Sequence, residues 1–75
     1  MGYFMKVNRE YEIITKKGNV FKFKTYKLDG LYHADIYHLG LRGQYIYERS
    51  CYYRKNKDDL FKSCKGWEDY YLNNF

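Results

Sequence analysis

The sequence has no proline, a single alanine (Ala34) and a single tryptophan (Trp67) among its 75 residues. Because small side chains are so scarce, large flat rings have to pack the core, and aromatic residues make up 23% of the chain. A chain of this length buries only about 60% of its unfolded surface. Eleven tyrosines are more than such a core can hold. We therefore expect several rings at the surface, where a patch of them indicates an interface.

Segments that would divide or target the chain are also missing. No repeat, linker or low-complexity stretch interrupts it, which predicts one compact domain over residues 1–75. A signal peptide and an apolar run of membrane-spanning length are both absent, so we expect a cytoplasmic protein without a membrane partner. In a reducing cytosol Cys51 and Cys64 are expected as free thiols. They lie thirteen residues apart without a second ligand pair, so no zinc site is expected.

Catalytic patterns are equally scarce. His33 and His38 fall on opposite faces of one predicted strand, so they do not share a metal ion. A nucleophile such as Ser50 or Cys51 would need a base, an oxyanion hole and a pocket, which a domain this small rarely builds. The glycines fit turns or a helix end and form no phosphate-binding pattern. We predict a non-enzymatic protein without catalytic residues, metal ligands or cofactors. An enzyme using His33 or Cys51 would instead show a deep pocket around them.

What the sequence does contain is strand periodicity. From Arg9 onward, polar and apolar residues alternate, which predicts a half-buried first strand with Tyr11, Ile13 and Thr15 on one face. Two more strands follow over Val20–Leu28 and residues 31–39, separated by turns at residues 17–19 and 29–30. Their expected inward residues are Phe21, Phe23, Tyr32, Ala34 and Ile36. Residues 3–7 could add a short edge strand.

The longest predicted strand runs from Gln44 to Arg54, after a turn over residues 40–43. Four of its residues are tyrosines and two are arginines, the types that dominate binding energy at interfaces. Its alternation allows two arrangements. Tyr45, Tyr47, Arg49 and Tyr53 share one parity and could form an outward patch, or Tyr45, Tyr47 and Cys51 could face the core.

The last part of the chain changes to helical periodicity. Asn56 or Asp58 can cap a helix, and Asn56 with Asp59 resembles a capping box. Gly66 predicts either one helix over about residues 58–73 or, as we favour, a split or kink. An apolar stripe would lie on the sheet at Leu60, Cys64, Trp67 and Tyr71. The predicted fold class is α+β: a small antiparallel β-meander of about four strands with a C-terminal helix packed on one face.

The function prediction depends on charge. Positive charge is concentrated in two regions of a chain with a net charge of +5. Residues 1–28 hold seven basic and two acidic residues, and residues 49–65 hold six basic and two acidic residues. Basic residues interleaved with strand-borne aromatics can hold phosphates and stack on bases. The candidate contact residues are Lys22, Lys24, Tyr26, Lys27, Arg49, Tyr52, Tyr53, Arg54, Lys55 and Lys57.

Two functions fit this surface. The first is a binding protein that engages nucleic acid or a nucleic-acid-handling protein. The second is an inhibitor or adaptor of the kind that phages and mobile elements encode, which would block a host protein complex through its tyrosines. A homodimer through a spare sheet edge or face would suit either one. Two simpler explanations stay open: a solvated basic surface, and an AT-rich source genome that enriches Tyr and Lys.

Overall fold

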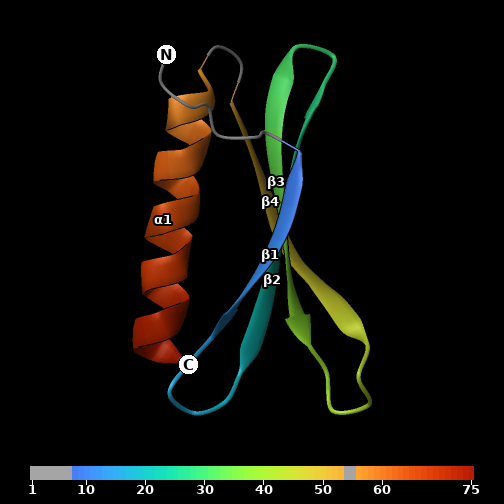
Figure 1. The fold of residues 1–75 in the computed structure, drawn as a ribbon, viewed down its shortest axis with the longest axis vertical. Helices are drawn as coiled ribbons and strands as arrows, with labels where there is room; N and C mark the ends of the chain where they lie inside the picture. Colours follow the sequence, from blue (N-terminus) through green and yellow to red (C-terminus); the bar gives the residue numbers. More distant parts are fainter. Residues whose placement is uncertain (1–7, 54–55) are drawn as a thin grey trace, which may run out of the picture.

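The protein folds as a four-stranded antiparallel sheet with one helix along one side (Figure 1). The computed structural model describes residues 8–53 and 56–75. The strands follow one another in space as they do in the chain, and α1 comes last. This confirms the predicted α+β meander with a C-terminal helix; the expected strand at residues 3–7 lies outside the described residues. The elements are β1 (Arg9–Ile14), β2 (Val20–Leu28), β3 (Leu31–Leu39), β4 (Tyr45–Tyr53) and α1 (Lys57–Asn74).

Tight turns hold the strands in register. Between β2 and β3 only Asp29 and Gly30 intervene, and both have positive φ, 52° and 77°. This backbone twist matches that of the strands in a two-residue hairpin, and Gly tolerates it because it has no Cβ. The hairpins account for the observed bounds of β2 and β3, which equal those predicted.

The side of the sheet on which α1 packs is called the covered face. It holds Phe23 and Ile36, both with 0% of their surface exposed, and these two residues are partners in the β2–β3 register. Paired residues of antiparallel strands point to the same side, so the predicted inward residues of β1, β2 and β3 all share this face. Tyr11, Ile13 and Tyr32 pack at the border of the core.

The helix contributes the apolar stripe that the sequence predicts. Leu60, Cys64 and Tyr71 are buried, and Trp67 packs against the core. Asn56 caps the helix, since its side-chain oxygen accepts from the backbone N–H of Asp58 at 2.8 Å. The covered face and this stripe together bury the core.

The helix continues through Gly66, so the expected division into two helices is wrong. Glycine costs about 1 kcal/mol in a helix interior relative to alanine. Buried residues of the stripe lie on both sides of Gly66, at Cys64 and Tyr71, and their burial outweighs that cost.

A β-bulge in β4 changes which of its side chains face the helix. Ile36 pairs with Arg49 and Tyr37 with Tyr47, so Glu48 is an extra residue in the ladder. Residues on either side of an extra residue change their parity relative to the neighbouring strand. Neither predicted arrangement of β4 is therefore correct.

On one side of the bulge Tyr45 and Tyr47 point away from α1, whereas beyond it Arg49 and Cys51 point toward α1. The prediction that Tyr45 and Tyr47 share a face with either Arg49 or Cys51 fails because it assumed a regular strand. Two other predictions are confirmed: His33 and His38 lie on opposite faces, and both cysteines are free thiols.

Contacts between the first strand and the helix tie the two ends of the described chain together. Tyr11 Oη donates to Glu68 Oε2 at 2.7 Å. The carbonyl oxygen of Phe75 accepts from Thr15 Oγ1 at 2.9 Å and from Asn19 Nδ2 at 2.6 Å. The end of α1 therefore lies beside the β1–β2 turn (Figure 1).

Candidate functional site

The side of the sheet away from α1 is called the open face, and no described element covers it. Its residues follow from the strand registers and from the side opposite to Phe23. They are Glu10, Glu12, Ile14, Val20, Lys22, Lys24, Tyr26, Leu28, Leu31, His33, Asp35, Tyr37, Leu39, Tyr45, Tyr47 and Ser50.

The centre of the open face is a hydrogen-bond network around Asp35. Its carboxylate accepts from Tyr26 Oη at 3.0 Å and from Ser50 Oγ at 2.6 Å. Tyr47 Oη donates to Ser50 Oγ at 2.8 Å, which extends the chain of hydroxyls. Partial burial and the hydrogen bond to Asp35 raise the pKa of Tyr26, so this phenol remains a donor at neutral pH. The network holds one carboxylate at a defined position.

Next to this network, Lys22 contacts a carboxylate and an aromatic ring of its own sheet. Its Nζ lies 3.9 Å from Glu10 Oε1 and 4.4 Å from the centre of the Tyr45 ring. Tyr45 in turn donates to the carboxylate of Glu12, and this hydrogen bond raises the pKa of Tyr45. With two lysines and three carboxylates in its middle rows, the open face is not strongly basic.

Positive charge gathers instead in a groove at one end of the sheet, where β1 begins and β2 continues beyond it. The groove has a volume of about 520 Å³. We call it the basic groove, because three cationic side chains and one carboxylate line it. Its residues are Asn8, Arg9, Glu10, Lys24, Thr25, Tyr26 and Lys27.

Aromatic rings support two of the three cations. The Arg9 guanidinium lies 4.3 Å from the centre of the Tyr11 ring, and Lys27 Nζ lies 5.1 Å from that of Tyr32. Such contacts orient a cation but leave its charge un-neutralised. Tyr26, which lines the groove itself, stacks on His33 with centroids 4.9 Å apart and planes 3° from parallel. Basic and aromatic side chains thus meet at this end of the sheet.

The structure brings together three of the ten predicted contact residues, Lys24, Tyr26 and Lys27, in the basic groove. Lys22 lies on the same strand in the middle of the open face, and Lys57 begins α1. Arg54, Lys55 and the side chains of Tyr52 and Tyr53 lie outside the described part of the structure. The sequence analysis missed Arg9, which the β1–β2 hairpin pairs with Thr25 and so places at the same end of the sheet as Lys24 and Lys27.

Arg49 lies apart from the other candidates, between the sheet and the helix. Its guanidinium carbon is 3.9 Å from the centre of the Trp67 ring. Its Nε is buried and has no hydrogen-bond partner in the described part of the chain. Arg49 therefore packs the covered face against α1, because the bulge turns it away from the open face.

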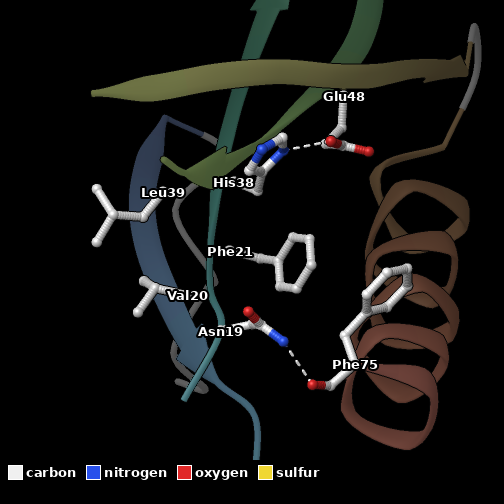
Figure 2. Close-up of a pocket in the computed structure, with 7 residues that line it drawn as sticks. All are labelled: Asn19, Val20, Phe21, His38, Leu39, Glu48 and Phe75. Atoms are coloured by element: carbon white, nitrogen blue, oxygen red, sulfur yellow. Dashed lines mark hydrogen bonds and ion pairs between the residues drawn. The ribbon is translucent and has the colours of Figure 1, made fainter. Parts of the chain in front are cut away.

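A second pocket lies between the sheet and the end of α1, and Figure 2 shows its lining residues. It measures about 250 Å³. His38 and Glu48 bond to each other in its wall, and Phe21 and Phe75 approach from the sheet and the helix. Val20 and Leu39 line its outer end and point to the other side of the strands (Figure 2). Neither His33 nor Cys51 lines this pocket.

Within residues 8–53 and 56–75, no three His, Cys, Asp or Glu side chains gather as a metal site would require. The one described helix is not apolar enough to cross a bilayer. Comparisons with protein-family models, curated proteins and solved structures find no match for this chain.

Proposed function

We propose that this protein is a non-enzymatic binding protein that holds single-stranded nucleic acid at the basic groove. The observation that carries the proposal is the arrangement of Arg9, Lys24 and Lys27 around one groove, with a single carboxylate, Glu10, among them. A polyanion gains most where fixed positive charges outnumber negative ones, because each neutralised phosphate releases a counterion.

The stacked pair of Tyr26 and His33 supports a single strand over a duplex. Bases of a single strand can leave their own stack and pack against an aromatic side chain, whereas bases within a duplex are already stacked. Tyr26 also lines the groove that holds the cations, so phosphate and base contacts can be made by one segment of the ligand.

The test is a salt series of binding to labelled single-stranded and duplex oligonucleotides of DNA and RNA. With three cations in contact, we expect affinity for single strands to fall roughly 20-fold between about 50 and 200 mM salt. Lys24→Glu and Lys27→Glu should each weaken binding at least about tenfold at low salt.

The matched control is Lys17→Glu, which makes the same charge change in the exposed turn at the other end of β2. If Lys17→Glu weakens binding as much as Lys27→Glu, the groove is not the site and only net charge matters. No binding of any oligonucleotide at low salt would contradict the proposal altogether.

A further inference from the structure

We propose that the open face packs against the open face of a second copy of this chain, forming a two-fold symmetric dimer. The proposal does not depend on nucleic-acid binding, and because such a dimer covers Lys24, Tyr26 and His33, it would compete with a strand bound at the basic groove. An apolar row crosses all four strands at the end of the sheet away from the basic groove. The row consists of Ile14, Val20, Leu39 and Tyr45.

This apolar row is in contact with water. Ile14 is 67% exposed and Leu39 37% exposed. Tyr47, in the next row, is 60% exposed, and its ring meets that of Tyr37 edge to face with centroids 6.0 Å apart. Four neighbouring strands that each present an apolar or aromatic side chain form a patch, which is typical of a docking surface and not of scattered exposed residues.

The pattern of charges selects a second copy as the partner. Residues that are partners across neighbouring strands form a row. A two-fold axis parallel to the strands, between β2 and β3, places β2 over β3 of the other copy. Each row then lies opposite the same row of the second copy. Lys24 and Asp35 are partners in the β2–β3 register. In the dimer, each Lys24 therefore faces the other copy's Asp35, and the four charges alternate in sign around the axis.

The other rows are complementary under the same axis. Val20 meets Leu39 of the second copy, and Ile14 meets Tyr45. Lys22 comes over Tyr37, a cation above an aromatic ring. A two-fold axis perpendicular to the strands would instead set β1 against β1 and bring Glu10 and Glu12 against the same carboxylates, so only the parallel axis suits this face.

The Asp35 network prepares the face for this contact. Tyr26 and Ser50 are neutral donors, so they fix the orientation of the carboxylate without cancelling its charge. A carboxylate that is already oriented loses little freedom when an ammonium group approaches it. Aligned packing of two twisted sheets at about 30° then allows the side chains of both faces to interdigitate.

The experiment is sedimentation velocity of the wild-type chain between about 1 and 100 µM, beside two variants. We expect a dimer for the wild type and at least a tenfold higher dissociation constant for Leu39→Asp, because the substitution buries an unpaired charge. The matched control is Leu72→Asp on α1, where the leucine is similarly exposed (40% against 37% for Leu39). Leu72→Asp should remain dimeric.

Charge reversal tests the predicted axis even if Leu39→Asp does not fold. Lys24→Asp and Asp35→Lys should each weaken the dimer, and combining them should restore it at least partly, since the pair is re-formed with opposite signs. A wild-type chain that stays monomeric at the highest concentration would overturn the proposal and leave the face for a different protein. A dimer unaffected by Leu39→Asp and by both reversals would also overturn it.

Discussion

The two faces of the sheet are built from alternate residues of the same strands, yet they are organised differently. The covered face packs aromatic side chains against α1, and Phe21 and Tyr71 stack across it with ring centroids 4.0 Å apart. The open face has hydroxyls, carboxylates and lysines in its middle and apolar groups at one end. The comparison teaches that the side of each strand that faces α1 builds the core, while the other side stays exposed.

The largest expected difference between the faces is in the free energy of unfolding. Phe23→Ala should lower it by about 3–5 kcal/mol, because it leaves a cavity in the centre of the covered face. Tyr47→Ala on the open face should cost less than about 1 kcal/mol in dilute protein. Urea denaturation followed by Trp67 fluorescence measures both. Equal losses would show that the open face is also part of the stabilising core.

Deleting Glu48 sharpens the comparison by making β4 regular. Tyr47 would then directly precede Arg49, so regular alternation keeps Tyr45 and Tyr47 on the open face and Arg49 on Trp67. Glu48→Ala is the control, since it keeps the chain length and the bulge and removes the same bond to His38. We expect the deletion to lower the free energy of unfolding by less than about 1 kcal/mol more than Glu48→Ala does, as measured by urea denaturation. A much larger loss would show that β4 needs the extra residue to pack.

The pH dependence of stability sharpens the comparison, because the buried thiol of Cys64 lies in the core between α1 and the covered face. Burial, and then the nearby Cys51, raise the pKa of Cys64 from its ordinary value of 9.0 to about 11. The folded state thus holds this proton more tightly than the unfolded state. The protonated Cys64 thiol therefore contributes to the free energy of unfolding in full below pH 9, and this contribution is lost as pH rises through 11.

The measurement is the urea midpoint of wild type and Cys64→Ala between pH 8 and about 10. The wild-type midpoint should fall more steeply with pH than that of the variant. Parallel curves for the two proteins would mean that the thiol ionises equally easily in the folded and unfolded states. Ionisation of Tyr11, whose pKa burial and Glu68 also raise, affects both proteins in the same direction.

The smallest expected effect concerns the helix that covers one face. Gly66 is exposed, and a Cβ at this position would meet no atom within 4 Å. Gly66→Ala should therefore raise the free energy of unfolding by about 0.5–1 kcal/mol. Thermal denaturation followed by circular dichroism measures the change. A lower melting temperature would show that the helix needs the flexibility of glycine at this point.

Most of the fold could be predicted because local signals agreed with one another. The Asp29-Gly30 turn and the alternation around Phe21 and Phe23 predicted the bounds of two strands, and Asn56, one of two candidate caps, marked the start of the helix. The one miss in the helix, its continuity through Gly66, arose because tertiary burial overrides a small propensity cost.

The site was harder to predict because a single extra residue decides it. No glycine next to Glu48 signals a bulge in the sequence. Regular alternation therefore predicted that Arg49 shares a face with Tyr45 and Tyr47. Within the basic groove, Lys24, Tyr26 and Lys27 follow from the sequence, whereas Arg9 requires the hairpin register. Lys24, Tyr26 and Lys27 are close in sequence and could be grouped from it, whereas the positions of Arg9 and Arg49 depend on strand register.

The bonds from Thr15 and Asn19 to Phe75 have a consequence for the order of folding. The sheet consists of hairpins between strands adjacent in the chain, so its contacts are short-range and fast to form. The helix closes against β1 across 57 residues, from Tyr11 to Glu68. On the ribosome, the strands emerge first and present both faces to water until the last turn of α1 has left the exit tunnel. Until then the apolar residues of the covered face stay exposed, and exposed apolar surface of this kind makes an incompletely folded chain prone to association.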